Sequence, residues 1–253
     1  MSEEINIFKY QDIRTLIFKQ EFIPKCCKKM KDWTNFDIAA TKGYIDIFIW
    51  HHKNNTLTVT SDTINFAAIN GHINIIEWLV DNKISECTDK TLRLSILKGQ
   101  FDIVKWIYLK YPEFFRFYNI TSLAIHSKQF EIFKWLVKTA NCEINDNTFS
   151  SAIRDGNIDI VKFIYNHTDK HYYMLISAIE HGNIAVLSWL INKYKPDYTQ
   201  CDLFYYASKS GNLNVLIWLK NNTYAICRKN SLEIAIANKH THCVDWLWKN
   251  HIF

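Results

Sequence analysis

A ten-residue phrase recurs along this chain. The stretch GHINIIEWLV at residues 71–80 returns as GQFDIVKWIY, GNIDIVKFIY and GNLNVLIWLK. Aligning the chain on the first glycine of the phrase yields eight copies, with anchor residues Gly43, Gly71, Gly99, Lys128, Gly156, Gly182, Gly211 and Lys239. The anchors are 26 to 29 residues apart and include all six glycines of the chain. A period of this length indicates a repeat protein, in which each short unit buries its apolar face against its neighbours.

Two further columns accompany the anchor. Seven residues after it stand Trp50, Trp78, Trp106, Trp135, Phe163, Trp189, Trp218 and Trp246. Four residues before it stand Ala39, Ala67, Ser95, Ala124, Ala152, Ala178, Ala207 and Ala235. The small residue permits close approach of neighbouring helices. The fixed place of the aromatic residues on a helix face predicts core residues rather than an aromatic cage or a base-stacking surface.

Each unit is predicted to be a pair of helices. A capping residue type often stands nine residues before the anchor, at Thr34, Asp62, Asn119, Asn147, Asp202 and Asn230. A short helix follows, and the anchor glycine ends it in the left-handed conformation. Lys128 and Lys239 must tolerate or avoid that geometry. The second helix has apolar residues two, four, five, seven and eight places after the anchor, so the chain is predicted to be all-α.

The composition indicates where in the cell the protein works and in which redox state its cysteines are. The start MSEEINIFKY lacks the basic and apolar regions of a secretory signal, and no run of eighteen apolar residues exists. Seven cysteines without a C-x-x-C pair favour reduced thiols over a disulfide framework. We therefore expect an intracellular, cytoplasmic protein that is not secreted and not in a membrane. A net charge of +5 is too small over 253 residues to indicate nucleic acid by itself.

The repeat resembles a known family. The pattern G-x-x-D/N-I-V-x-W-L, with alanine four residues and an apolar residue seven residues before its glycine, is similar to the helix-turn-helix of ankyrin repeats over roughly residues 33 to 250. The Thr-Pro-Leu-His opening and the Gly-Ala-Asp segment of that family are absent, and the period is about five residues shorter than 33. The resemblance implies an ankyrin-type solenoid with shortened or irregular β-hairpin loops. Tetratricopeptide and HEAT repeats are competing solenoids whose periods fit worse.

The resemblance also suggests a domain organisation. Residues 1–32 lack the pattern and are predicted to form an N-terminal capping helical segment, followed by the repeat array over 33–253. Tryptophan in place of the family's usual valine or leucine, with abundant Asn, Ile and Lys, looks most like the divergent ankyrin proteins encoded by giant DNA viruses of amoebae.

No enzyme is expected. Because every glycine serves an interhelical turn, no phosphate-binding loop, dinucleotide fingerprint or nucleophile elbow can be present. His51 and Cys243 stand in apolar columns of the repeat, so they indicate buried residues rather than metal ligands. Asp46, Asp102 and Asp159 recur where the second helix begins, which suits the helix dipole. We predict no catalytic residue, no cofactor and no metal.

The resemblance implies that partners bind along the concave side formed by the first helices and the loop tips. The candidate residues there are Lys42, Asn70, Lys98, His126, Arg154, His181, Tyr205 and Lys209. The predicted function is that of a monomeric, non-catalytic protein–protein interaction scaffold or adaptor without a small-molecule substrate, directed at a host protein if the source is viral. The alternative is a basic scaffold that binds nucleic acid or an acidic surface through Lys25, Lys28, Lys29, Lys31, Lys42 and Lys98.

Overall fold

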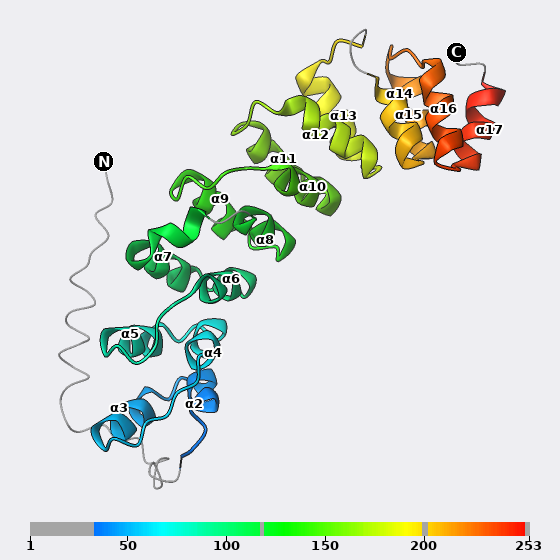
Figure 1. Ribbon diagram of the computed structural model, residues 1–253. Helices are drawn as coiled ribbons and strands as arrows, with labels where there is room; N and C mark the ends of the chain where they lie inside the picture. Colours follow the sequence, from blue (N-terminus) through cyan, green and yellow to red (C-terminus); the bar gives the residue numbers. More distant parts are fainter. Residues whose placement is uncertain (1–32, 117–118, 199–201, 251–253) are drawn as a thin grey trace, which may run out of the picture. The chain divides into compact units, whose positions relative to one another are not determined.

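The computed structural model describes residues 33–116, 119–198 and 202–250. Within those residues the regular structure consists of sixteen α-helices and a short 3-10 helix, with no strand (Figure 1). The prediction of an all-α, ankyrin-type solenoid is thus confirmed for the described residues, in which the loops that were predicted to be shortened or irregular β-hairpins contain no strand. The predicted capping segment 1–32 lies outside the described residues. The chain divides into two compact units, Met1–Glu86 and Cys87–Phe253.

The first unit contains two helix pairs, α2 (Phe36–Lys42) with α3 (Ile45–Lys53), and α4 (Thr63–Ile69) with α5 (Ile73–Asp81). Helix α2 packs against both α3 and α4, and α4 packs against α5. A polar contact also joins the two first helices, because Thr63 Oγ1 donates a hydrogen bond of 2.5 Å to Asp37 Oδ1.

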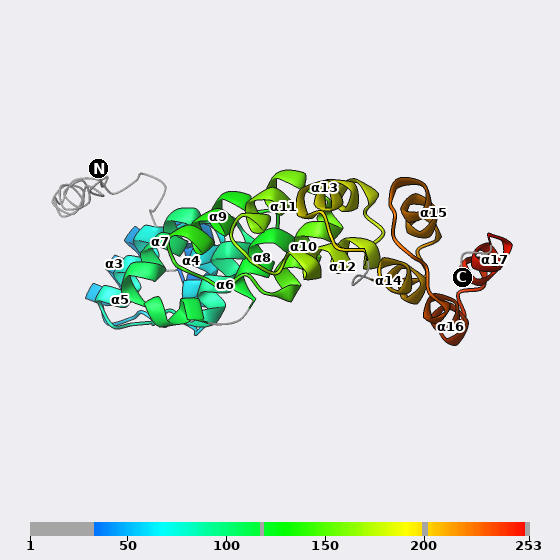
Figure 2. The same cartoon turned by 90° about the horizontal axis from the view of Figure 1, so that it is seen from above.

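The second unit contains six helix pairs. In each pair the even-numbered helix comes first and the odd-numbered helix second. The helices are α6 (Asp89–Leu97), α7 (Phe101–Lys110), η2 (Pro112–Arg116), α8 (Ile120–His126), α9 (Phe130–Lys138), α10 (Asp146–Asp155), α11 (Ile158–Tyr165), α12 (His171–Glu180), α13 (Ile184–Tyr194), α14 (Leu203–Ser210), α15 (Leu213–Asn222), α16 (Lys229–Ala237) and α17 (Thr241–Lys249). The first helices α6 to α16 pack successively against one another and form one row, and the second helices form another (Figure 2).

The turn inside each pair has one geometry. All eight anchor residues have positive φ, including Lys128 at 60° and Lys239 at 61°. In seven of the eight turns the residue after the anchor donates its backbone N–H to the carbonyl of the small residue four places before the anchor, as in His72 to Ala67 at 3.0 Å. At the eighth turn the N–H of the anchor Gly156 itself donates to the carbonyl of Ala152. Either bond closes the end of the first helix and requires a left-handed anchor, which glycine adopts without strain. The two lysines therefore tolerate the geometry.

In each unit the core lies between the first helices and the second helices of its own pairs. The small residues four places before the anchor are all buried. In the second helix the buried residues lie four, five and eight places after the anchor, as in Ile75, Ile76 and Leu79. His51 and Cys243 occupy two of these places and are buried, as predicted.

The prediction that the aromatic column is core is wrong. All eight of its residues, Trp50 to Trp246, are only half-buried. They stand one place before the buried position of the second helix, so each ring lies at the edge of the core and keeps one side in solvent. Trp135 illustrates the environment, since it meets Tyr108 edge to face at 5.3 Å between ring centroids.

The capping predictions are partly confirmed. Asp62, Asn119 and Asp202 are the N-cap residues of α4, α8 and α14, but only Asp202 accepts a backbone N–H, that of Tyr205. The other three predicted caps are wrong, because the helices begin after Asn35, Asn145 and Arg228. Asn35 and Asn145 still cap through their side-chain oxygens, so the residue type is right and the offset is not.

Candidate functional site

The eight candidate residues share one local setting with a single exception. Seven of them lie within two residues of an anchor, where the first helix ends, and all seven are exposed. We call these seven residues, together with Tyr205, the first-helix strip, and describe its part in each unit separately. Tyr205 lies one helical turn before Lys209 on the same face of α14 and is half-buried.

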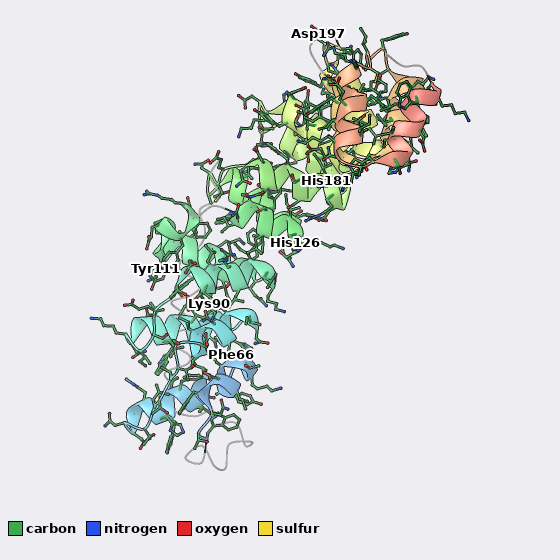
Figure 3. All side chains as sticks on the ribbon, turned by 45° about the vertical axis from the view of Figure 1, so that its right-hand side comes forward. Phe66, Lys90, Tyr111, His126, His181 and Asp197 are labelled. Atoms are coloured by element: carbon green, nitrogen blue, oxygen red, sulfur yellow. The ribbon has the colours of Figure 1, made fainter. Side chains whose placement is uncertain are left out.

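In the first unit, Lys42 is the last residue of α2 and Asn70 follows the end of α4. The Asn70 side chain is occupied, because its Nδ2 donates a hydrogen bond of 2.8 Å to the carbonyl of Phe66 in its own helix. Phe66 and Ile38 are exposed on α4 and α2, and Phe66 is labelled in Figure 3. This part of the strip therefore offers a lysine beside apolar side chains.

In the second unit, the strip brings His126 and Arg154 together. Arg154 Nη2 lies 3.4 Å from His126 Nδ1, and these residues come from the adjacent first helices α10 and α8. His181 follows the end of the next first helix, α12, so it continues the same line of helix ends (Figure 3). Arg154 and His126 are both exposed, so the guanidinium is accessible at the surface.

Charge on this line of helix ends is unbalanced. At the anchors of the second unit and the two positions before them stand the cations Lys98, Lys128, Arg154, Lys209 and Lys239. The acids in the same positions are Asp155 and Glu180. Within the described residues none of these seven groups forms an ion pair. By contrast, acids early in the second helices are paired at i,i+3, as Glu131 is with Lys134 at 2.9 Å. The first-helix ends thus carry uncompensated positive charge.

Two tyrosine doublets lie on neighbouring first helices, and of their four residues only Tyr205 was predicted from the sequence as a candidate site residue. Tyr172 and Tyr173 lie in α12, and Tyr205 and Tyr206 lie in α14, which packs against α12. Tyr173 is 57% exposed, and the rings of Tyr205 and Tyr206 meet edge to face at 5.4 Å. The visible signal was the doublet itself, in HYYML and in FYYAS, because the consensus does not require aromatic residues there. Exposed tyrosine is enriched among residues that dominate protein interfaces.

The turns beside the first-helix strip are hydrogen-bonded to the preceding repeat. Asn183 Nδ2 donates to the carbonyl of Ile153 at 2.9 Å, and Asn212 Nδ2 donates to that of Ile179 at 2.8 Å. His240 Nε2 lies 3.1 Å from the carbonyl of Lys209, which is itself a strip residue. These three side chains directly follow an anchor. Each of these three bonds ties the end of one first helix to the following repeat, so the strip residues at these helix ends lie on hydrogen-bonded turns.

The junction after Lys128 differs. Asn157 occupies the same position, but its side-chain oxygen accepts from Asp159 N–H and Ile160 N–H of its own helix α11. A bridge to the preceding repeat would bring the Asn157 side chain against the Lys128 side chain, whereas the other bridging residues lie against glycine. The non-glycine anchor and the missing bridge are thus two aspects of one local structure.

The described residues hold no group of three or more His, Cys, Asp or Glu side chains that could bind a metal. His51 Nδ1 lies 2.8 Å from Thr56 Oγ1, and its ring packs against Phe36. Burial raises the pKa of the Cys142 thiol to about 11 and that of the Cys243 thiol to about 11. Both thiols are therefore protonated and poorly nucleophilic at neutral pH.

The comparisons agree with this architecture. Two overlapping stretches, residues 121–202 and 149–230, match the family model for ankyrin repeats in three copies. The fold is that of ankyrin-type repeats, and the same left-handed anchor recurs outside the matched residues at Gly43, Gly71, Gly99 and Lys239. No curated protein matches the chain.

Among solved structures, the chain is similar to the human ASB11 ankyrin repeat domain, with 12% identity and a TM-score of 0.32. The match covers 82% of this chain and 96% of that one. A TM-score this low supports no inference about partners. Among the described residues, no helix is long and apolar enough to span a membrane.

Proposed function

We propose that this chain is a non-catalytic scaffold that binds another protein along the first-helix strip. Ankyrin-type repeats generally mediate protein–protein interaction, and here the core columns are constant while the strip residues differ from repeat to repeat. The observation that carries the proposal is the uncompensated positive charge at the first-helix ends of the second unit, next to the tyrosine doublets. Arginine and tyrosine are the residue types that most often dominate binding energy.

The chemistry of the strip specifies the partner further. In the second unit, five cations and two acids stand at the first-helix ends. The contacting surface of the partner is therefore expected to be acidic. Arg154 is suited to a carboxylate, because its planar guanidinium can form two parallel hydrogen bonds. The tyrosines of α12 and α14 supply apolar contact area beside this charge.

The resemblance to repeats encoded by giant DNA viruses adds a finer proposal. The partner is a host protein, and the chain acts as a monomer in the host cytoplasm. The tryptophan column at Trp135 and its equivalents supports the resemblance, although it lies on the second helices and not on the strip.

The test is affinity capture from an amoebal lysate followed by mass spectrometry. Wild-type chain is compared with the double variant Lys98→Glu/Arg154→Glu and with the matched control Lys105→Glu/Lys162→Glu, which reverses two lysines of the second helices. We expect one or a few proteins to be captured by the wild type and the control and lost with the strip variant. A set of proteins that is the same for all three would overturn the proposal.

A second candidate function uses the same cations. Lys42 and Lys98 are exposed at first-helix ends, whereas Lys25, Lys28, Lys29 and Lys31 lie outside the described residues. If the chain is a nucleic-acid scaffold, it binds generic RNA or DNA, and the affinity falls steeply with salt. Electrophoretic mobility at low salt separates the two functions, because a protein scaffold with only five spread cations is expected to leave the nucleic acid unshifted.

A further inference from the structure

A side-chain contact links two neighbouring first-helix ends of the second unit. His126 is the last residue of α8, and Arg154 lies in the last turn of α10, which packs against α8. Arg154 Nη2 lies 3.4 Å from His126 Nδ1, and His126 is labelled in Figure 3. Among the described residues, neither side chain forms another hydrogen bond or an ion pair, and both are exposed. Arg154 is therefore not paired with an acid of the described chain.

The contact identifies His126 as a hydrogen-bond acceptor. A guanidinium always carries its charge in proteins and has no acceptor atom, so Nδ1 of His126 must accept the hydrogen bond. An imidazole that accepts at Nδ1 is neutral and carries its proton on Nε2. This tautomer is assigned from the hydrogen bond itself. A neutral histidine thus holds one end of the guanidinium without reducing its charge.

The guanidinium keeps a complete pair of donors for a ligand. It has two edges with parallel N–H groups, and Nη2 contributes one N–H group to each edge. The hydrogen bond to His126 uses one of these groups, so the other edge retains both donors. Two parallel donors match the two oxygens of a carboxylate. The contact with His126 also restricts the arginine side chain before a ligand binds, which lowers the entropic cost of binding.

Two acids of the same helix ends do not occupy this donor edge. Asp155 follows Arg154 in the sequence, and Glu180 stands in α12 where Arg154 stands in α10, two residues before the anchor. Helix α12 packs against α10. Neither acid forms an ion pair within the described residues, although a carboxylate is a stronger acceptor for arginine than an imidazole is. The edge therefore remains available to a carboxylate from outside the chain.

Small side chains leave this part of the strip open. Ser122 and Ser150 lie one helical turn before His126 and Arg154 on the same helix faces, and both serines are half-buried. In the equivalent place the other first helices of the second unit carry Arg93, Ile176, Tyr205 and Glu233. A partner side chain can thus approach Arg154 over the short serine side chains.

We propose that Arg154 binds one carboxylate of the partner protein and that neutral His126 is the positioning residue for this contact. The inference rests on the proposed function and names the group that the first-helix strip recognises in the second unit. The carboxylate is that of an acidic side chain or of a C-terminus, since both present the same pair of oxygens. His126 acts through Arg154, because it fixes which edge of the guanidinium is presented.

The probe is a pair of phage-displayed libraries of random decapeptides, selected against the full chain after depletion on Arg154→Gln. One library fuses the C-terminus of each peptide to the coat protein, so only side-chain carboxylates are available. The other presents a free C-terminus. Selected peptides are synthesised, and their Kd is measured by fluorescence polarisation. We expect binders with Asp or Glu from the first library if the ligand is a side chain, and binders from the second library alone if it is a C-terminus.

Four variants test the two roles. Arg154→Lys keeps the charge but loses the paired donors, so it should raise Kd about tenfold. His126→Leu removes the acceptor and should raise Kd about threefold to tenfold, because the guanidinium must then be ordered on binding. His126→Asn places a side-chain oxygen close to the position of Nδ1 and should restore Kd to within about twofold. The matched control His52→Leu removes an exposed histidine that meets Trp78 and should leave Kd unchanged.

Two further measurements separate positioning from a general structural effect. In the Arg154→Lys background, His126→Leu should raise Kd by less than about twofold, because its effect passes through the guanidinium. In chain with isotope-labelled histidine, long-range proton–nitrogen spectra at slightly alkaline pH should show His126 as the Nε2–H tautomer. The signal is assigned by its absence from His126→Asn. Circular dichroism and the unfolding midpoint verify that each variant is folded.

Several outcomes overturn the inference. It fails if no peptide remains after depletion, if Arg154→Lys or His126→Leu binds as the wild type does, if His126→Asn binds no better than His126→Leu, or if His126 is mainly the Nδ1–H tautomer. A phosphoserine peptide that binds more tightly than its glutamate counterpart would make phosphate the ligand.

Failure of this inference is distinguishable from failure of the proposed function. If the carboxylate site fails while the strip variant Lys98→Glu/Arg154→Glu still loses its captured protein, the proposed function stands. Peptides that require both Arg154 and His126, together with lysate capture unaffected by the strip variant, would keep the carboxylate site and refute the proposed function.

Discussion

The side-chain amide of Asn183 donates a hydrogen bond of 2.9 Å to the carbonyl oxygen of Ile153, in the repeat before its own. The same nitrogen would lie 3.1 Å from a Cβ placed on the anchor Gly156. One glycine thus serves two purposes, since its left-handed φ ends the first helix and its missing side chain admits the bridging amide. The supports of the first-helix strip depend on this arrangement.

Removal of one bridge should loosen the stack. Asn212 Nδ2 donates to the carbonyls of Ile179 and Glu180, each at 2.8 Å, and to Ser210 Oγ at 3.1 Å. Asn212→Ala is expected to lower the free energy of unfolding by about 1–3 kcal/mol, because carbonyl groups lose their partner. Urea unfolding measures the loss. The control Asn214→Ala alters an exposed residue of α15, the helix whose N-cap is Asn212, and should change the free energy by less than about 0.5 kcal/mol.

Substitution of the anchor residue should change the stability in opposite directions at Gly211 and at Lys239. Gly211 has φ 73°, and a Cβ there would lie 2.7 Å from His240 Nδ1. Gly211→Ala is expected to cost about 1–3 kcal/mol through strain and the displaced histidine. Lys239 holds the same conformation with a side chain, so Lys239→Gly should stabilise by about 0.5–1 kcal/mol. Thermal unfolding of both variants is the measurement. A neutral Gly211→Ala would contradict the role given to the anchor.

The residues of the aromatic column should contribute unequally to the free energy of unfolding. Trp135 meets three rings edge to face, those of Phe101, Tyr108 and Phe115, at centroid distances of 5.8, 5.3 and 6.2 Å. Trp218 occupies the equivalent place and has no ring contact within the described residues. Trp135→Leu is therefore expected to cost about 1–2 kcal/mol more than Trp218→Leu in urea unfolding, since each ring pair adds a fraction of that amount. Equal costs would mean that burial alone determines the energy.

Alkaline pH should destabilise the second unit through its buried thiols. Burial raises the pKa of Cys87 from 9.0 to about 12 and that of Cys142 from 9.0 to about 11. Above pH 9 the unfolded thiols lose protons that the folded thiols keep, so the stability conferred by these protonated thiols is present below pH 9 and falls as the pH rises toward 11 to 12. Urea unfolding from pH 8 to 11 should show the decline. A Cys87→Ala/Cys142→Ala variant should show a shallower decline, and an unchanged slope would contradict the assignment.

The repeat could be predicted from the sequence because the constraints on each turn involve residues close together in the chain. A left-handed anchor admits glycine best, and the bond from the residue after it to the small residue before it recurs in the same register. The helix pairs and the burial of His51 and Cys243 therefore follow from spacing alone. The N-caps at Asn35 and Asn145 did not follow, because the length of the loop before each first helix varies and shifts the start of the helix.

The surface was less accessible because its properties depend on neighbouring repeats. The tryptophans are half-buried because their position on the second helix lies at the border of the buried face. The sequence of a single repeat does not show where that face ends. The contact between His126 and Arg154 joins residues 28 positions apart on adjacent helices.

The central claim is that a protein partner binds the first-helix strip. Its most direct test is titration calorimetry of the captured partner against the wild type, the strip variant Lys98→Glu/Arg154→Glu and the second-helix control Lys105→Glu/Lys162→Glu. We expect the strip variant to raise Kd at least about tenfold, equivalent to about 1.4 kcal/mol, while the control stays within about twofold of the wild type. Loss of affinity with the control variant, together with an unchanged Kd for the strip variant, would show that the partner binds elsewhere.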